Sequence, residues 1–168
     1  YSVSNSTDIE SADVDNDGDL DLVVANYDSP IEIFYSIEGE FQENASAYIH
    51  TLGNTSDISI GDINQDGYLD IVSANQYEKN EIFMNQGGSF SQQADWVSSN
   101  SLLTRSVDLG DYDHDGDLDV IFGNYAEPNE IYANEGGSVS SQPLWVTENV
   151  TEENRGWTDD FLFEDVDG

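Results

Sequence analysis

The chain of 168 residues contains no cysteine and almost no basic residues. Without cysteine there are no disulfide bonds, no thiolate metal ligands and no cysteine nucleophile. Lysine and arginine together number 3, against 36 aspartate and glutamate residues, so the formal net charge is -33. Such a chain repels phosphate backbones and anionic lipid surfaces, which excludes nucleic acid as a partner.

Long apolar runs are also missing. No segment is apolar enough for membrane insertion, and none has the basic and apolar regions of a signal peptide. No stretch of ten residues or more carries helical spacing. Hydrophobic residues still make up 37% and aromatic residues 11% of the chain, which is sufficient for a packed core. These features predict an all-β domain.

A nine-residue acidic motif occurs three times, with its first residues 49 positions apart. The copies are Asp13-Val-Asp15-Asn-Asp17-Gly18-Asp19-Leu-Asp21, Asp62-Ile-Asn64-Gln-Asp66-Gly67-Tyr68-Leu-Asp70 and Asp111-Tyr-Asp113-His-Asp115-Gly116-Asp117-Leu-Asp119. A truncated copy, Asp165-Val-Asp167-Gly168, begins 54 positions after the third. Alternate oxygen ligands around a glycine turn suit a hard cation of the size of Ca²⁺.

We predict that each motif binds Ca²⁺ through the side chains at positions 1, 3, 5 and 9 and the backbone carbonyl at position 7. The predicted metal ligands are Asp13, Asp15, Asp17, Asp19, Asp21, Asp62, Asn64, Asp66, Tyr68, Asp70, Asp111, Asp113, Asp115, Asp117 and Asp119, with Asp165 and Asp167 in a partial fourth site. Asn64 brings less charge than the aspartate at this position in the other loops. We therefore expect the second site to be the weakest.

Two other interpretations of the motif are weaker. An EF-hand loop shares the first six positions but requires glutamate at position 12, where this chain has Val24, Ser73 and Phe122. Ordinary Asp-Gly turns would not recur three times in register. The apolar, β-branched residues that follow each motif favour a loop that leads into a strand.

Each motif lies in a repeat of about 49 residues that predicts four strands. An alternating segment precedes the motif at 8–12, 57–61 and 106–110, and an apolar run follows it at 20–26, 69–75 and 118–124. A third strand is expected from Glu32, Glu81 and Glu130, and after a glycine turn a further strand opens at Phe41, Phe90 and Val139.

Four-stranded antiparallel units with this period are typical of β-propeller blades. We expect about three and a half blades in a single repeat domain, at residues 8–56, 57–105 and 106–159, with the start of a further blade at 160–168. Each blade would carry its Asp-rich calcium loop between its first two strands.

The acidic motifs and the strands after them, such as Leu20-Asp-Leu-Val-Val-Ala-Asn26, resemble the FG-GAP/VCBS-type repeat of integrin α-subunit propellers and of many extracellular proteins. The resemblance covers essentially the whole chain, apart from Asn64 and the incomplete fourth loop. It implies a calcium-binding β-propeller and an extracellular, non-catalytic role as a scaffold or as an adhesion or recognition module.

Partners of such a module would be a protein or glycan ligand, or further copies of the chain. A closed propeller needs roughly four to eight blades. Either a longer chain or neighbouring copies, as in a surface fibre, would therefore complete this one. The alternative function is the propeller part of a larger extracellular enzyme acting on polysaccharides. With 36 acidic residues, carboxylate pairs are uninformative about catalysis, and no catalytic motif is present.

Several single residues lead to further expectations. Asn5, Asn44, Asn54 and Asn149 lie in sequons that permit N-glycosylation. Trp96 and Trp145 align one repeat apart and are expected in the core between blades, where the first repeat has Ala47. His114 is expected to point outward from the third loop, and His50 to be structural. Tyr27, Tyr77 and Tyr125 follow the second strands, where they could stack on a sugar or a protein.

Overall fold

The computed structural model describes residues 5–147, and every described residue belongs to a strand, a turn or a loop. No helix occurs in this range, as the sequence predicts. The expectations for Asp165, Asp167, Asn149 and the start of a further blade at 160–168 lie outside the described residues.

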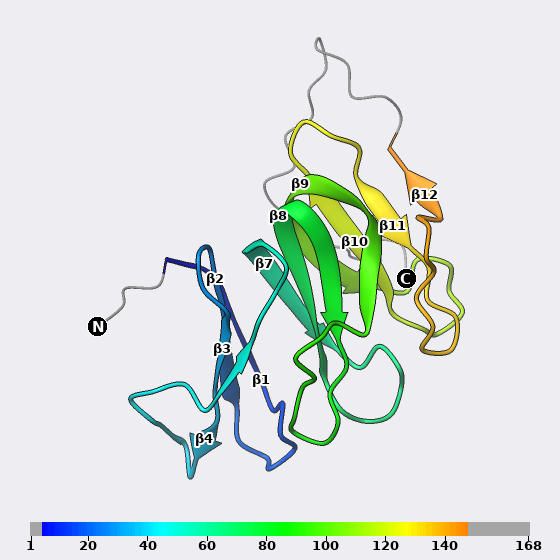
Figure 1. The fold of residues 1–168 in the computed structure, drawn as a ribbon. Helices are drawn as coiled ribbons and strands as arrows, with labels where there is room; N and C mark the ends of the chain where they lie inside the picture. Colours follow the sequence, from blue (N-terminus) through cyan, green and yellow to red (C-terminus); the bar gives the residue numbers. More distant parts are fainter. Residues whose placement is uncertain (1–4, 148–168) are drawn as a thin grey trace, which may run out of the picture.

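The first sheet has four antiparallel strands in the order β1-β2-β3-β6 (Figure 1). Its strands are β1 (Ser6–Ala12), β2 (Asp21–Asn26), β3 (Ile31–Phe34) and β6 (Ala47–Ile49). Between β3 and β6 lies a small separate hairpin of β4 (Ser36–Ile37) and β5 (Glu40–Phe41).

The second sheet has six strands in the order β12-β11-β10-β9-β8-β7. Its strands are β7 (Asn54–Gly61), β8 (Asp70–Phe83), β9 (Trp96–Gly110), β10 (Asp119–Asn124), β11 (Glu130–Tyr132) and β12 (Trp145–Val146). The pairings between neighbouring strands of this sheet are antiparallel. The second and third repeats therefore share one hydrogen-bonded sheet, joined through β8 and β9.

The long strand β8 contains the predicted turn between two strands. Tyr77 has a left-handed φ of 62°, and the buried Asn75 reaches across this point. Its Nδ2 donates to the Lys79 carbonyl at 2.9 Å, and its backbone N–H donates to Asn80 Oδ1 at 2.8 Å. An extended strand cannot bring residues 75 and 79 together in this way, so the chain bends back at Tyr77.

The same asparagine closes the turn after the second strand of every repeat. Asn26 Nδ2 donates to the Pro30 carbonyl at 2.9 Å, and Asn124 Nδ2 donates to the Pro128 carbonyl at 2.6 Å. Both side chains are fully buried, like that of Asn75. The asparagine that ends each apolar run in the sequence thus satisfies a backbone carbonyl that the turn would otherwise leave unpaired.

Two apolar clusters form the core, on opposite faces of strand β8. Ile71 and Phe83 pack in the first cluster with residues of β2, β3 and β6, such as Val23. Val72 and Ile82 pack in the second cluster with residues of β10 and β11. Because neighbouring residues of a strand point to opposite faces, β8 is apolar at consecutive positions and is buried on both sides.

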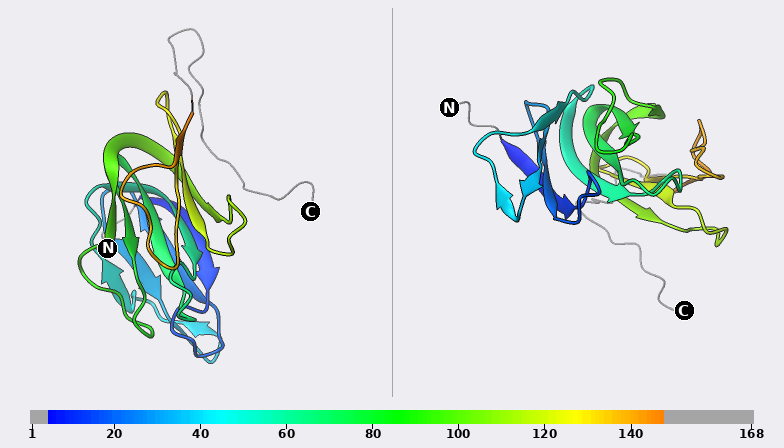
Figure 2. Two further views of the ribbon diagram at one scale, coloured as in Figure 1. Left: turned by 90° about the vertical axis from the view of Figure 1, so that its right-hand side faces the viewer. Right: turned by 90° about the horizontal axis from the view of Figure 1, so that it is seen from below.

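The repeats follow one another as side-by-side layers. In the view from below, the strands of the first sheet, those of β7 and β8, and those of β10 and β11 succeed one another in chain order (Figure 2). This stacking explains why the side chains that cover one repeat come from the next repeat along the chain.

The predicted start of the fourth strand is wrong. The strand that pairs with β3 or β11 starts at Ala47 or Trp145, about six residues after the predicted Phe41 or Val139. Phe41 lies in the β4–β5 hairpin, while Phe90 and Val139 form only single bridges with Asn85 and Asn134. These residues pair within the glycine turn, and the next strand of the sheet starts only after the turn.

The expectation for the two aligned tryptophans holds for one of them. Trp96 packs on the second core cluster, with its ring 4.9 Å from that of Tyr132. The side chain of Trp145 is 45% exposed within the described structure. The residues that cover Trp96, such as Phe122 and Tyr132, belong to the following repeat.

Candidate metal-binding loops

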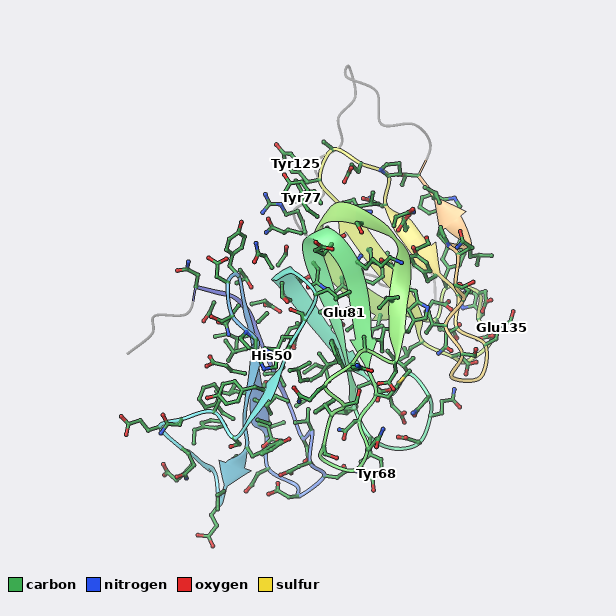
Figure 3. The ribbon with its side chains drawn as sticks, viewed as in Figure 1. His50, Tyr68, Tyr77, Glu81, Tyr125 and Glu135 are labelled. Atoms are coloured by element: carbon green, nitrogen blue, oxygen red, sulfur yellow. The ribbon has the colours of Figure 1, made fainter. Side chains whose placement is uncertain are left out.

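The three acidic motifs form the loops that join β1 to β2, β7 to β8 and β9 to β10. They lie at one end of the strands. Tyr68, in the second loop, is at the lower end of the molecule, whereas Tyr77 and Tyr125 are at the opposite end (Figure 3). The alternating segment before each motif and the apolar run after it are the two strands that hold the loop.

The carboxylate at position 1 organises each loop by accepting two backbone hydrogen bonds. Asp13 accepts from the N–H of Asp17 and of Gly18, both at 3.0 Å. Asp62 makes the equivalent bonds at 3.0 and 3.0 Å, and Asp111 makes them at 3.1 and 3.0 Å. The backbone reaches this geometry because the position-6 glycines have φ values between 90° and 97°, a region that favours glycine.

The carboxylate at position 9 is fully buried in all three loops. Its Oδ2 accepts the N–H of position 2, for example from Val14 to Asp21 at 3.0 Å. Its Oδ1 accepts the N–H of the residue fifteen positions further on, in each case at 2.8 Å. These donors are Ser36, Asn85 and Asn134, just beyond the third strand. Position 9 thus fixes the loop to the sheet.

Oxygen ligands converge in the first and third loops. Carboxylate oxygens of Asp13, Asp15 and Asp21 lie within 4.8 Å of one another. In the third loop the converging carboxylates are those at positions 1, 3 and 5 instead, which are Asp111, Asp113 and Asp115. Both groups could hold a metal ion, and their donors are the hard carboxylate oxygens that divalent cations such as Ca²⁺ accept.

The acidic loops are electrostatically unfavourable without a cation. Burial, and then the neighbouring carboxylates of Asp21 and Asp17, raise the pKa of Asp15. Burial raises the pKa of Asp70, at position 9 of the second loop, to about 6, although it accepts hydrogen bonds from Asn85 and Ile63. A bound cation would remove this repulsion, so the donor set fits a metal ion.

The second loop differs at position 3, as its sequence suggests. The Asn64 amide donates from Nδ2 to Asp66 Oδ2 at 3.0 Å, while its Oδ1 accepts the Asp66 N–H at 2.9 Å. Its amide nitrogen cannot bind a cation. This loop therefore lacks the group of three converging acids that the other two loops have.

The predicted ligands at positions 5 and 7 of each loop are joined by a hydrogen bond. Asp17, Asp66 and Asp115 at position 5 each accept the N–H of position 7 at 2.9 Å. The position-7 residues are Asp19, Tyr68 and Asp117, from which the sequence predicts only a backbone carbonyl. The Asp117 side chain also accepts hydrogen bonds from Gln65 and from the Gly136 N–H.

Some contacts of the loops were not predicted from the motif. Asn85 and Asn134 contact two loops each, and Gly88 and Gly137 lie against Asp15 and Asn64. The 49-residue spacing of both pairs is visible in the sequence. It marks them as part of the repeat but does not show that they reach the preceding loop.

Other candidate residues lie at the surface. His114 and His50 are exposed, as expected of His114. Tyr77 is 69% exposed, and Tyr125 lies beneath the Arg105 guanidinium, 5.5 Å from its ring centroid. That these tyrosines stack on a sugar or a protein stays a prediction.

The all-β architecture, with antiparallel sheets stacked in chain order, places this chain among proteins with a β-propeller-like fold. The sequence matches the FG-GAP-like repeat over residues 13–73 and again over 62–122. The chain therefore belongs to the FG-GAP-like repeat family. No curated protein has a significant sequence match to it.

Two solved structures support the fold. Both are crystal structures of BBS1N in complex with ARL6DN, one soaked with lead and one soaked with mercury. Their TM-scores to this chain are 0.52 and 0.54, each at 13% sequence identity, and the alignments cover 86% and 84% of the chain. This chain spans less than half of each solved chain, 44% and 46% respectively. Within residues 5–147 no helix could span a membrane.

Proposed function

We propose that this protein is a calcium-stabilised, non-catalytic β-propeller scaffold or recognition module that works outside the cell. Each acidic loop binds one Ca²⁺ between the first two strands of its blade. The main support for this proposal is that one loop geometry recurs three times. The hydrogen bonds to positions 1 and 9 are the same in each loop and have nearly the same distances.

The blades of this proposal are the three repeats. The first comprises β1, β2, β3 and β6; the second comprises β7, the two arms of β8 and the beginning of β9. The third comprises the rest of β9 with β10, β11 and β12. The register supports this division: Val23 pairs with Ile33 in the first blade, and Ile121 pairs with Ile131 in the third.

Calcium would replace the disulfides that the chain lacks. A site with a dissociation constant near 10 µM, in a medium with about 1 mM free calcium, would stabilise the folded state by about 2.7 kcal/mol. Extracellular fluids hold calcium at such levels, which supports a role outside the cell.

A protein partner is the recognition function that we favour. The solved structures with the same fold are complexes with another protein, ARL6DN. The turns that carry Tyr77 and Tyr125 lie at the end opposite Tyr68 and its calcium loop (Figure 3). Aromatic residues with a polar tip are enriched in protein interfaces.

Isothermal titration calorimetry on the metal-free protein tests the calcium proposal. We expect uptake of at least three Ca²⁺ per chain, with much weaker heats for Mg²⁺, which prefers a smaller and more regular ligand shell. Absence of calcium binding at 1 mM would contradict the proposal. Calcium-dependent turnover of a polysaccharide panel would contradict the non-catalytic role.

A further inference from the structure

We propose that the calcium loops are coupled in chain order, because one asparagine in each of the second and third repeats joins its own loop to the loop of the preceding repeat. The two residues are Asn85 and Asn134. This inference rests on the proposed calcium binding and adds a rule for which loops influence each other.

Asn85 contacts the first and the second loop at once. Its backbone N–H donates to Asp70 Oδ1 at 2.8 Å, and Asp70 is the position-9 ligand of the second loop. Its side-chain Nδ2 donates to the carbonyl of Val14 at 2.7 Å, and Val14 is position 2 of the first loop. Asn85 is only 1% exposed, so water cannot readily replace either hydrogen bond.

Asn134 repeats this arrangement between the second and the third loop. Its N–H donates to Asp119 Oδ1 at 2.8 Å, and its Nδ2 donates to the Ile63 carbonyl at 2.8 Å. In the first repeat the equivalent residue is Ser36, which keeps the bond to position 9, donating to Asp21 Oδ1 at 2.8 Å. Serine thus preserves the link within a repeat and lacks the amide that reaches the preceding loop.

The glycine turn after each asparagine packs against the preceding loop. A Cβ atom on Gly88 would lie 3.0 Å from Asp15 Cβ and 3.2 Å from its Cα, and one on Gly137 would lie 2.9 Å from Asn64 Cα. Asp15 and Asn64 are the position-3 ligands. The Gly88 N–H donates to Asn85 Oδ1 at 2.8 Å, so this asparagine also positions the turn that covers the first loop.

A second set of bonds runs between the same pairs of loops. The side chain at position 4 donates to the position-6 carbonyl of the next loop, from Asn16 to Gly67 and from Gln65 to Gly116, each at 3.1 Å. Adjacent loops therefore touch through two independent contacts that recur at the same positions. The described contacts include no direct bond between the first and the third loop.

These contacts make binding in adjacent loops cooperative. A cation held by Asp70 fixes the position of Asn85, and Asn85 then holds Val14 and the covering turn in place before a cation enters the first loop. The affinity gain is reciprocal, because coupling between two binding sites must be equal in both directions. The coupling thus passes from the first to the second loop and from the second to the third.

Nuclear magnetic resonance resolves the three loops separately. The amides of Gly18, Gly67 and Gly116 each donate to the position-1 carboxylate of their own loop at 3.0 Å, so each resonance reports one site during a calcium titration. The test variants are Asn85→Ser and Asn134→Ser, which place in each repeat the residue that the first repeat already uses.

Asn85→Ser loses the three side-chain hydrogen bonds of the asparagine, to Val14, Leu69 and Gly88. We expect the calcium midpoints of Gly18 and Gly67 to rise at least about threefold to tenfold, which is the effect of one such bond. The Gly116 midpoint should rise least, because only the intact link through Asn134 connects the third loop to the weakened second loop. In Asn134→Ser the Gly67 and Gly116 midpoints should rise most and that of Gly18 least. Each variant is thereby the control for the other.

Three results would contradict the proposed coupling, and the third would also contradict the proposed calcium binding. Unchanged midpoints in both variants would show that the asparagines carry no coupling. An equal rise at all three glycines would show a general loss of stability. If calcium moves none of the three resonances in the wild-type protein, the proposed calcium binding itself fails, which separates that failure from the failure of the coupling.

Discussion

The Trp96 indole donates a hydrogen bond from Nε1 to the Ser140 carbonyl at 3.0 Å, across the boundary between the second and the third repeat. The same ring lies parallel to Phe122 at 6.3 Å and edge-on to Tyr132 at 4.9 Å. One residue of one repeat thus contacts both the turn and the core of the next.

Replacement of this tryptophan should therefore destabilise the stack of repeats. We expect Trp96→Ala to lower the free energy of unfolding by about 3 kcal/mol, since it removes a large packed ring and a hydrogen bond. Urea unfolding measured by circular dichroism checks this value. The matched control is Trp145→Ala, which should lower the free energy of unfolding much less because this side chain is 45% exposed. Equal losses in the two variants would contradict the role of Trp96 in joining the repeats.

The carboxyl groups of Asp8 and Asp57 meet where β1 packs beside β7. Asp57 accepts the N–H of Val107 at 2.8 Å, and Asp8 accepts the N–H of Ile58 at 3.3 Å. Burial, together with the Asp8 carboxyl that shares a hydrogen bond with it, raises the pKa of Asp57 to about 7. Glu10 is a further acidic group close to Asp8, and burial followed by the Asp8 and Asp108 carboxylates raises its pKa.

This raised pKa predicts that the free energy of unfolding falls as the pH rises. A carboxyl whose pKa is higher in the folded state stabilises the fold fully below its ordinary value of about 4 and loses that contribution as the pH passes through 7. Asp57→Asn should keep the bond from Val107 and remove the titration, raising stability at pH 8 by about 1–2 kcal/mol because the pair is partly solvated.

Thermal unfolding between pH 4 and pH 8, in chelator, checks this prediction. The difference between Asp57→Asn and the wild type should grow with pH over this range. The exposed Glu43→Gln serves as a control for the simple loss of a negative charge. A constant difference across the range, or one equal to that of the control, would refute the shared proton.

Substitution of the side chain at position 3 of the first loop should have opposite effects on the stability of the protein with and without calcium. Asp15→Asn copies the second loop, which has Asn64. In chelator the variant should be more stable than the wild type by about 0.5–1 kcal/mol, because one carboxylate is removed from a repelling group. In calcium it should be less stable, because the site has lost a charged ligand.

Melting curves of Asp15→Asn and of the reverse variant Asn64→Asp, each with and without calcium, test this crossover. The two substitutions should have opposite effects in both conditions. If Asp15→Asn destabilises the protein equally with and without calcium, Asp15 has only a structural role.

The buried asparagine after the second strand should be essential for the fold. Asn75 accepts a hydrogen bond from the Thr55 hydroxyl at 3.0 Å and donates to Lys79 and to Glu81. Asn75→Ala should lower the free energy of unfolding by about 2–4 kcal/mol, since it leaves several buried groups unpaired. The exposed Asn44→Ala is the control in the same denaturation experiment and should be neutral.

Much of this structure could be predicted from local sequence. The glycine at position 6, the alternating acids and the apolar run after them determine the loop and its two strands, because all of the contacts involved lie within about fifteen residues. The absence of a group of three converging acids from the second loop follows from Asn64. The family match follows from the same segments.

The contacts between repeats could not be predicted in this way. Nothing in the local sequence of Asn85 indicates that it reaches Val14, 71 residues earlier, because that contact depends on how two sheets stack. The start of the last strand was wrong for a related reason: Phe41 satisfies a strand pattern locally, but its partner is Ser36 in a separate hairpin. Burial of Trp96 likewise depends on the neighbouring repeat.

The central claim is that calcium stabilises this fold, and thermal unfolding of the wild-type protein tests it most directly. With 1 mM Ca²⁺ we expect a melting temperature at least 10 °C above that in EGTA, since about 2.7 kcal/mol per occupied site corresponds to a shift of several degrees. The same concentration of Mg²⁺ should give a much smaller shift. An identical melting temperature in calcium and in EGTA would contradict the account.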